Sequence, residues 1–298
     1  ILMFNVESLA ELEQINRSAG KFKMRAPVSI RVNPDVDPKT HPYTATGLKK
    51  NKFGIGADAA LESYRVAAGL EHIEIVGVDC HIGSQITEAE PFQAALENLK
   101  GLINELKSMG TPIRYLDVGG GLGITYADET PPSLREYAAA IMRQLKDMEL
   151  QLILEPGRVL VGNAGILVTK VLYRKSGEVK NFVIVDAGMN DLMRPTLYNA
   201  FHAIEPVVNS GNDLIVADVV GPICESGDFL AIDRSISNVQ SGDLMAIMSA
   251  GAYGYVMSSN YCSRPRVAEV MVKGDRFEVV KAREVYEDLV RGETVPDF

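Results

Sequence analysis

Three consecutive glycines, Gly119 to Gly121, follow the apolar run 113–118. Because glycine has no side chain, such a backbone can approach a ligand closely and direct several N–H groups at it, as a bound phosphate requires. The segment has neither the Lys-Ser or Lys-Thr pair of a Walker A loop nor the full spacing of the dinucleotide fingerprint. It therefore indicates a strand followed by an anion-binding loop, with a ligand-free turn as the alternative.

Further reactive side chains follow other short apolar runs of the chain. In a parallel β/α barrel such side chains lie where strands end and loops begin, so they share one rim. Together they supply an aromatic base, a hydroxyl, a carboxylate and a guanidinium group. The residues are Asn33 and Pro34 after the run 28–32, His81, Ser84 and Gln85 after 73–80, and Glu155, Pro156, Gly157 and Arg158 after 150–154.

This combination suits the cofactor pyridoxal phosphate, whose phosphate requires a glycine loop, a hydroxyl and arginine. Its ring nitrogen requires a buried carboxylate, and its flat face requires a stacking side chain. We therefore expect Glu155 at the ring nitrogen, His81 against the ring, and a phosphate site formed by Ser84, Gly120 and Gly121. A structural histidine and an ordinary capping or ion-pair role of Glu155 are the alternatives. The histidines lack metal-ligand spacing and there is no Cys-x-x-Cys motif, so no metal site is expected.

The composition is that of a globular protein long enough for two domains: 298 residues, 46% hydrophobic and 23% charged. Acidic residues number 39 against 30 Lys and Arg, and the net charge of −9 argues against a nucleic acid or an anionic membrane as partner. Three scattered cysteines do not make a disulfide framework, so we expect a reducing, cytoplasmic compartment. No apolar run is long enough for a membrane span.

The first half of the chain alternates short apolar strands with helices. Capping-box spacing of a hydroxyl and a carboxylate predicts helix starts, and glycines predict left-handed helix ends. The alternation predicts a parallel sheet, either doubly wound or closed as a barrel. The starts are Ser8 with Glu11, Thr87 with Glu90 and Ser133 with Glu136; the ends are Gly20, Gly110 and, for a helix 59–68, Gly69; the strands are 2–6, 28–32, 73–80, 113–118 and 150–154.

The second half is rich in strand-like runs and nearly lacks helical periodicity. This texture predicts an all-β second domain after a boundary near 158–162. Turns such as Lys273-Gly274-Asp275 separate the runs. The expected strands are 159–161, 166–173, 182–185, 214–219, 244–247, 267–272 and 277–280.

A series of motifs, in order along essentially the whole chain, resembles those of the diaminopimelate decarboxylase family. That family belongs to the barrel-type, fold III pyridoxal phosphate enzymes, with ornithine and arginine decarboxylases and alanine racemase. The resemblance implies a barrel domain, a C-terminal β domain of sandwich or barrel-like form, and a homodimer whose active sites lie between subunits. The motifs are Arg31-Val32-Asn33-Pro34, Lys52-Phe53-Gly54-Ile55, His81-Ile82-Gly83-Ser84-Gln85, Asp117-Val118-Gly119-Gly120-Gly121-Leu122-Gly123, Glu155-Pro156-Gly157-Arg158, Asp186-Ala187-Gly188-Met189-Asn190-Asp191-Leu192-Met193-Arg194-Pro195, Cys224-Glu225-Ser226-Gly227-Asp228 and Gly251-Ala252-Tyr253-Gly254.

The resemblance also implies roles for individual residues. Glu225 corresponds to the contact with the distal ammonium group of the substrate, and Cys224 to the proton donor; in the family their loop reaches the other subunit's active site. Tyr253 corresponds to a contact with the cofactor phosphate and the substrate. The substrate-carboxylate contacts correspond to Arg158, Arg194 and Tyr198, and the cofactor-binding motif to Glu155, Pro156, Gly157 and Arg158. For Cys224 the alternative is a buried structural thiol.

The chain departs from the family in one respect. Family members carry the lysine that bonds to the cofactor in a Lys-Ala-Asn motif near the N-terminus, and no such motif occurs here. The chain opens on the apolar run 1–4, as if in the middle of a fold, and offers five barrel strands where eight are needed. We therefore expect residues 1–160 to form strands 4 to 8 of a partial (β/α)8 barrel and 161–298 to form the C-terminal β domain. The chain is then a portion of a longer protein, with little activity alone, and its lysines nearest a strand end, Lys49, Lys50 and Lys52, form a solvated basic turn.

The function that the resemblance implies is decarboxylation of meso-2,6-diaminopimelate to L-lysine and carbon dioxide, the last step of lysine biosynthesis. Arg194 and Tyr198 favour this substrate, because a plain diamine has no distal carboxylate for an arginine to hold. One alternative is a sibling decarboxylase acting on ornithine, arginine or carboxynorspermidine. A second is a non-catalytic, decarboxylase-like regulator.

Overall fold

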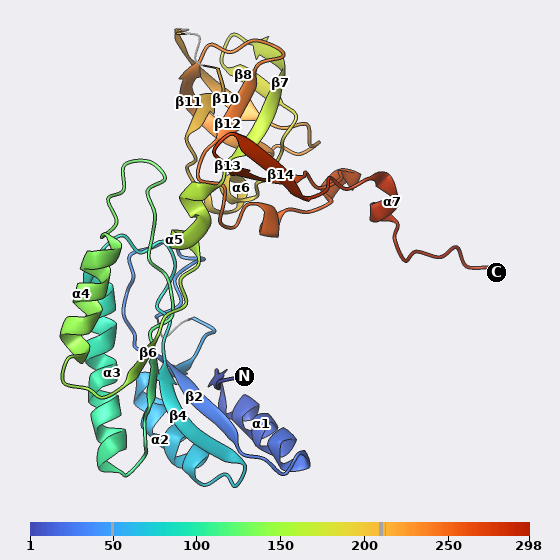
Figure 1. Cartoon of the computed structure of the whole chain (residues 1–298). Coiled ribbons are helices and arrows are strands. Elements are labelled where there is room, and N and C mark those ends of the chain that lie inside the picture. The colour runs from blue at the N-terminus through green and yellow to red at the C-terminus, as the bar shows by residue number, and fades with distance from the viewer. Residues whose placement is uncertain (49–50, 209–210, 212) are drawn as a thin grey trace. The chain divides into compact units, whose positions relative to one another are not determined.

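The computed structural model describes residues 1–48, 51–208, 211 and 213–298. The chain consists of two compact units, Ile1–Leu160 and Val161–Phe298 (Figure 1). Each unit has its own sheet and its own apolar core. In the described part of the chain, no helix combines the length and the apolar character that crossing a membrane requires.

The first unit is built on a parallel sheet, as the alternation of strands and helices predicts. Its strand order is β1-β2-β4-β5-β6, and the short β3 pairs with β2. The short, β-branched strands suit a parallel sheet whose faces are covered. The strands are β1 (Phe4–Val6), β2 (Ala26–Asn33), β3 (Ile55–Gly56), β4 (Ile73–Asp79), β5 (Tyr115–Asp117) and β6 (Gln151–Ile153).

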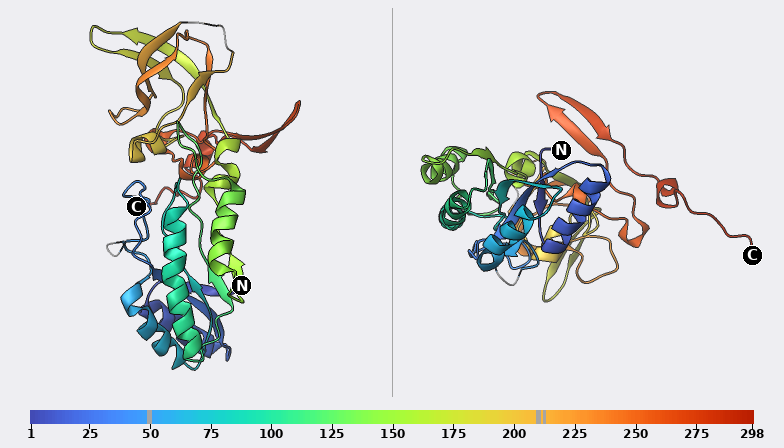
Figure 2. Two further views of the ribbon diagram at one scale, coloured as in Figure 1. Left: turned by 90° about the vertical axis from the view of Figure 1, so that its left-hand side faces the viewer. Right: turned by 90° about the horizontal axis from the view of Figure 1, so that it is seen from below.

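Four helices pack with this sheet: α1 (Leu9–Lys21), α2 (Ala57–Ala68), α3 (Glu90–Ser108) and α4 (Leu134–Leu145). Figure 2 shows α3 and α4 lying side by side, and the two helices are in contact. Their apolar stripes, among them Leu99 and Ile103 of α3 and Ile141 of α4, belong to the core of the unit. Tyr64 of α2 accepts a hydrogen bond from Ile30 N–H (3.3 Å) and donates one to the Gly77 carbonyl (2.8 Å), which ties the helix to β2 and β4.

The helix starts follow two of the three predicted caps. Ser133 forms the complete capping box with Glu136, and the Ser8 hydroxyl accepts a hydrogen bond from Glu11 N–H. Thr87 does not cap α3, which begins at Glu90 after Ala89. With Thr87 as cap, Pro91 would occupy the fourth helical position, whose N–H should donate to the carbonyl of residue 87. Proline has no N–H, so the helix starts later.

The three helices end at or within two residues of the predicted glycines, but only one of these glycines has the left-handed conformation. Gly110, with φ of +80°, supplies the left-handed residue after α3. Gly69 follows α2 but has a right-handed φ of −81°, and Gly20 lies inside α1. The left-handed residue after α1 is Lys23, with φ of +53°.

The second unit is built on a six-stranded sheet of order β11-β10-β8-β7-β12-β9, in which only β8 and β10 run parallel. Its core contains Val171, Val183, Leu230 and Met245, among others. A separate hairpin pairs β13 with β14 through a turn in which Gly274 has φ of +62°. The strands are β7 (Leu167–Ser176), β8 (Asn181–Val185), β9 (Ile204–Pro206), β10 (Leu214–Val220), β11 (Phe229–Ser237), β12 (Leu244–Ile247), β13 (Glu269–Lys273) and β14 (Arg276–Lys281).

Some elements near and within the second unit differ from the prediction. The run 159–161, expected as a strand, forms the short helix α5 (Arg158–Val161). A short apolar run has no period that separates strand from helix, so the sequence pattern does not distinguish the two. Strands β9 and β11 are not predicted by the sequence pattern. Two further short helices, α6 (Arg194–Tyr198) and α7 (Tyr286–Leu289), interrupt the expected all-β texture, as do 3₁₀ turns at Gly162–Ala164, Tyr255–Met257 and Tyr261–Ser263.

Candidate active site

One face of the parallel sheet carries charged residues at its carboxyl end. Arg31 of β2 pairs in register with Asp79 of β4, which pairs with Asp117 of β5. Directly paired residues point to the same side of a sheet, so these three side chains share one face. Their neighbours one position earlier, Ile30, Val78 and Leu116, belong to the apolar core. We call Arg31, Asp79 and Asp117 the charged layer.

The carboxylates of the charged layer are deeply buried, with 3% of Asp79 and 2% of Asp117 exposed. Asp117 accepts hydrogen bonds from Gly119 N–H (2.9 Å) and Asn5 Nδ2 (3.1 Å). Asp79 Oδ1 has no hydrogen-bond partner among the described residues. Burial, reinforced by the charge of Asp117, raises the pKa of Asp79 to about 8, although Arg31 acts in the opposite direction. Asp79 therefore holds a proton at neutral pH.

His81 follows β4 and contacts the glycine run. Its Nδ1 accepts a hydrogen bond from Gly120 N–H (3.1 Å). Burial, with a smaller effect of the nearby Arg31 charge, lowers the pKa of His81 to about 4. The ring is therefore neutral at physiological pH, and its orientation is fixed from the loop after β5.

The glycine run fits closely against the loop after β6. Glu155 N–H donates to the Gly119 carbonyl (2.8 Å), and a Cβ atom placed on Gly120 would collide with the Glu155 carbonyl oxygen. Gly119 and Gly121 have φ values of +66° and +101°, which side chains rarely allow. The N–H of Gly120 is already engaged by His81, whereas that of Gly121 has no hydrogen-bond partner in the part of the chain that the structure describes. The loop can therefore accept an anion at Gly121.

Gln85 braces the glycine run from the loop after β4. Its side-chain amide donates to the Ile124 carbonyl (2.5 Å) and accepts from Ile124 N–H (3.1 Å). Ile86 adds two backbone hydrogen bonds of 2.9 Å, to the Gly121 carbonyl and from Gly123 N–H. Ser84 lies half-buried beside them and donates its N–H to the Thr44 carbonyl (3.1 Å). The loops after β4 and β5, which would hold a phosphate, are thus joined by several hydrogen bonds.

Glu155 and Arg158 differ in burial. Glu155 is exposed, as are Pro156 and Gly157, although a buried carboxylate was expected. Desolvation and the neighbouring Asp117 raise the pKa of Glu155. Arg158 is buried at the start of α5, where its Nη1 donates to the hydroxyl of Tyr126 and its guanidinium group lies 5.7 Å from the centre of that ring. Tyr126, which the motifs do not single out, therefore orients Arg158.

In the second unit, Arg194 begins α6 and Tyr198 ends it. Arg194 is buried and Tyr198 half-buried. Arg194 Nη1 lies 2.8 Å from Nε2 of the fully buried His202, a residue that sequence reasoning missed. The chain reverses after α6 at Asn199, which has φ of +51°.

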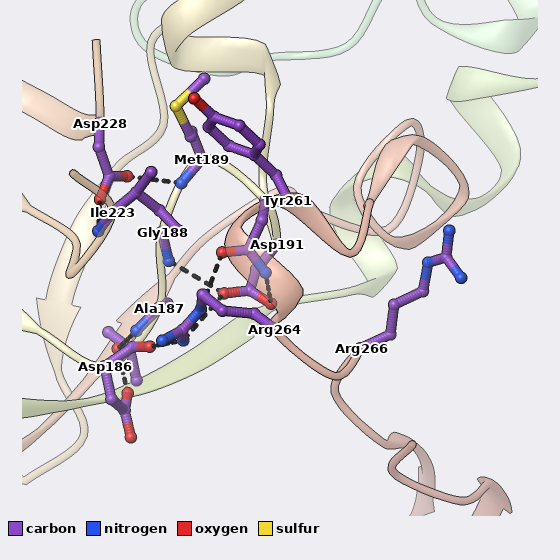
Figure 3. A network of polar contacts seen from close by, with 12 residues as sticks. Asp186, Ala187, Gly188, Met189, Asp191, Ile223, Asp228, Tyr261, Arg264 and Arg266 are labelled. Atoms are coloured by element: carbon purple, nitrogen blue, oxygen red, sulfur yellow. Dashed lines mark hydrogen bonds and ion pairs between the residues drawn. The ribbon is translucent and has the colours of Figure 1, made fainter. Parts of the chain in front are cut away.

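The loop before α6 is held by a polar network (Figure 3). Asp191 accepts from Gly188 N–H (2.9 Å), and Arg264 donates to Asn190 Oδ1 (3.2 Å) and lies 3.9 Å from Asp191 Oδ2. Asp228 accepts two hydrogen bonds of 2.7 Å, one from Met189 N–H and one from Ile223 N–H. Asp228 thereby joins this loop to the segment that carries Cys224 and Glu225.

Cys224 and Glu225 are both exposed, so Cys224 is not the buried structural thiol considered as an alternative. The hydroxyl of Tyr261 donates to Glu225 Oε2 (2.6 Å), which fixes the direction of that carboxylate. Tyr253 is 40% exposed and has φ of +57°, an unusual conformation for a side chain of this size. Strain of this kind is frequent at functional sites.

The structure brings together His81, Gly120, Gly121 and Glu155 in the first unit. In the second unit, Arg194 begins α6 directly after the loop that Asp228 joins to the segment of Cys224 and Glu225. It adds the charged layer, which the sequence signals only through charged residues inside apolar strands. Lys49 and Lys50 lie outside the described residues. Lys52 is exposed, with its ammonium group 5.1 Å from the centre of the Phe53 ring, as expected for a solvated turn.

Comparison with known proteins identifies the family. The model of the pyridoxal-dependent decarboxylase, pyridoxal binding domain, matches residues 1–162. Diaminopimelate decarboxylase from Pseudomonas aeruginosa is 53% identical over 292 residues, covering 98% of this chain and 70% of that protein. The enzyme from Aquifex aeolicus is 52% identical over 291 residues, covering 97% of this chain and 69% of that protein.

Solved structures agree with this comparison. The crystal structure of diaminopimelate decarboxylase from Helicobacter pylori complexed with L-lysine superposes with a TM-score of 0.93 at 44% identity. The match covers 98% of this chain and 73% of that one. The family model and the sequence matches over nearly the whole chain agree with the fold comparison, and the chain belongs to the diaminopimelate decarboxylase family of pyridoxal-dependent enzymes.

Proposed function

We propose that the protein decarboxylates meso-2,6-diaminopimelate to L-lysine and carbon dioxide, the last step of lysine biosynthesis, with pyridoxal phosphate as cofactor. The observation that carries the proposal is the identity of more than half of the matched positions with diaminopimelate decarboxylases over nearly the whole chain. The relative from Helicobacter pylori, solved with L-lysine, supports the same product.

The residues of the first unit fit the cofactor. The neutral, flat ring of His81 can stack on a pyridine ring, and Gly121 N–H and the Ser84 hydroxyl can bind a phosphate. Glu155, with its raised pKa, can hold a proton between its carboxylate and the ring nitrogen. When bound, pyridoxal phosphate supplies an electron sink for the electron pair that remains when the carboxylate leaves. Pro156, Gly157 and Arg158 complete the cofactor-binding motif.

The remaining roles follow the chemistry of the substrate, which carries an amino acid group at each end. A selective site needs a fixed cation and a fixed anion away from the reacting carbon. We propose that the substrate carboxylate is bound by Arg158, Arg194 and Tyr198, and that the distal ammonium group is bound by Glu225. Tyr253 contacts the cofactor phosphate and the substrate. Cys224 returns a proton to the carbon from which carbon dioxide has departed.

The same proposal covers the architecture and assembly. The parallel sheet of residues 1–160 forms strands 4 to 8 of a (β/α)8 barrel, and 161–298 form the C-terminal β domain. The chain spans 69% to 73% of the length of the relatives compared above. The likeness to the solved decarboxylase structure supports this assignment. We further propose a homodimer with shared active sites, working in the cytoplasm.

A substrate panel tests the function. Full-length protein loaded with pyridoxal phosphate is assayed for carbon dioxide release from meso-diaminopimelate, ornithine and arginine under the same conditions. We expect release from diaminopimelate to be the fastest by at least about a hundredfold, because loss of the paired distal carboxylate leaves a buried arginine unmatched. Faster turnover of ornithine or arginine would support the sibling decarboxylase, and cofactor binding without turnover of any of the three would support the regulator.

A further inference from the structure

The buried His202 connects the start of α6 to the end of β12. One ring nitrogen, Nε2, lies 2.8 Å from Arg194 Nη1, and the other, Nδ1, lies 2.8 Å from the carbonyl oxygen of Met248. None of the His202 surface is exposed. The ring therefore sits between a guanidinium group and a backbone carbonyl, away from water.

These two partners fix the protonation of the ring. A carbonyl oxygen only accepts hydrogen bonds, so Nδ1 must carry a hydrogen; a guanidinium group only donates, so Nε2 must be the acceptor. The imidazole is thus neutral, with its single N–H at Nδ1. A neutral imidazole holds Arg194 through a hydrogen bond without neutralising its positive charge, whereas a carboxylate at this position would neutralise that charge.

The sheet of the second unit fixes His202 itself. Met248 N–H donates to the Ala203 carbonyl (2.8 Å), directly after β12. Arg234 of β11 donates to the His202 carbonyl (2.8 Å), and its guanidinium group lies 3.8 Å from the centre of the Phe201 ring. The position of the imidazole is therefore set by two strands and is not free to follow Arg194.

We propose that His202 is a positioning residue that aims the Arg194 guanidinium group at the substrate carboxylate and so sets the preference for amino acids over plain diamines. The proposal rests on the proposed function, in which Arg194 binds that carboxylate. It goes further by assigning the orientation of the Arg194 side chain to a hydrogen-bond acceptor of defined tautomer in the segment between α6 and β9.

A matched pair of variants tests the proposal. In His202→Asn the amide nitrogen can replace Nδ1 toward Met248, but no atom reaches Arg194; in His202→Gln the amide oxygen can replace Nε2. The dissociation constants of L-lysine and of cadaverine, the diamine of the same length without a carboxylate, are measured by calorimetry on the full-length protein loaded with cofactor. We expect His202→Asn to weaken lysine binding about tenfold with cadaverine unchanged, and His202→Gln to restore most of the lysine affinity.

The outcomes separate the possible failures. A purely structural role of His202 would weaken both ligands equally, and an unchanged ratio of the two affinities in His202→Asn overturns the proposal. Arg194→Gln serves as reference: if it leaves the ratio unchanged, the carboxylate role of Arg194 in the proposed function is wrong. If wild-type protein does not prefer lysine to cadaverine, the preference that His202 is proposed to set is absent and the proposal is overturned, whereas the proposed function is decided by the substrate panel.

A measurement on wild-type protein does not depend on the folding of any variant. Nitrogen-15 NMR of labelled histidine distinguishes the two neutral tautomers of His202. We expect the proton on Nδ1 and an unprotonated Nε2. A proton on Nε2 would contradict the hydrogen bond from Arg194 and overturn the proposal.

Discussion

At the scale of single residues, the candidate site holds its ionisable groups in protonation states that differ from those in water. Asp79 keeps a proton and His81 lacks one at neutral pH, because both are buried; Asp117 adds to this effect at Asp79, and Arg31 adds to it at His81. The result is a compact polar surface with less net charge than its composition suggests. Such a surface can accept a cofactor ring and an anion without a large electrostatic cost.

The protonated Asp79 predicts a loss of stability as pH rises. Its folded pKa of about 8 exceeds the unfolded value of about 4, so the folded state binds the extra proton between these limits and loses stability as pH rises through them. His81 has the opposite effect below about pH 6.5. Its folded pKa of about 4 lies below its unfolded value of about 6.5, so stability rises with pH between these values. Between pH 6.5 and 8 His81 no longer opposes the Asp79 effect, which reaches about 2 kcal/mol.

Urea unfolding at several pH values checks this prediction. We expect Asp79→Asn to abolish the decline in unfolding free energy between pH 6.5 and 8, because asparagine does not titrate. Glu97→Gln, a change of an exposed carboxylate on α3, is the control and should retain the decline. Equal slopes for wild type and Asp79→Asn would show that Asp79 is ionised in the folded protein.

Cys224 provides the second test at this scale. We expect Cys224→Ala to lower kcat at least about a hundredfold with little change in KM, because in the proposed function the thiol acts after binding, when it returns a proton to carbon. Cys262→Ala is the matched control, since Cys262 is the other exposed thiol and should leave both constants unchanged. Steady-state kinetics measure kcat and KM of both variants. A Cys224→Ala enzyme with normal kcat would show that this residue is not the proton donor.

The sequence identifies the site residues that follow the predicted strands better than those that lie within them. His81, the glycine run and Glu155 stand at predicted strand ends, where the rim of a parallel sheet collects reactive groups. Asp79 and Asp117 lie within the predicted runs 73–80 and 113–118, although they end the observed strands β4 and β5, and their proximity depends on the register between these strands. Tyr126 and His202 act on arginines 32 and 8 residues away, through contacts that no local pattern encodes.

At the scale of elements, local patterns succeed where one side chain meets the backbone a few residues away. The Ser133 box is complete because both partners are within one helical turn. Strand β11 escapes prediction because Asp233 has φ of +46° and the pairing with β10 shifts register nearby, which interrupts the alternation of apolar and polar residues. Strand β9 has three residues and ends in proline, so it carries no period at all.

The contrast between Ser133 and Thr87 gives a prediction for helix stability. We expect Ser133→Ala to lower the unfolding free energy by about 1 kcal/mol, because the N–H of Glu136 in the first turn of α4 loses its acceptor. Thr87→Ala should change it by less than about 0.5 kcal/mol, because Thr87 caps no helix. Chemical denaturation measures both, and equal effects would mean that Thr87 contributes a cap after all.

At the scale of the whole molecule, the chain holds two separate apolar cores. Leu99 of α3 belongs to one and Leu230 of β11 to the other, and each is 1% exposed. Replacing either by alanine should cost about 2–5 kcal/mol through lost burial and the cavity left behind. We expect the effect to be confined to the unit that contains the substitution.

Hydrogen exchange followed by mass spectrometry can resolve the two units. Leu99→Ala should speed exchange in residues 1–160 alone, and Leu230→Ala in 161–298 alone. Faster exchange throughout the chain in either variant would mean that the two cores unfold as one cooperative block.

The close approach of Gly120 to the Glu155 carbonyl also determines which alleles natural selection can keep. The obstacle is a backbone atom, so no side-chain adjustment can make room for a Cβ. In a library of all codons at this position, selected for growth without supplied lysine, only glycine should survive. Gly101 is the counterpart: a Cβ there meets nothing within 4 Å on an exposed helix surface, so alanine should spread freely at that codon. Two glycines in one gene would thus evolve under opposite constraints.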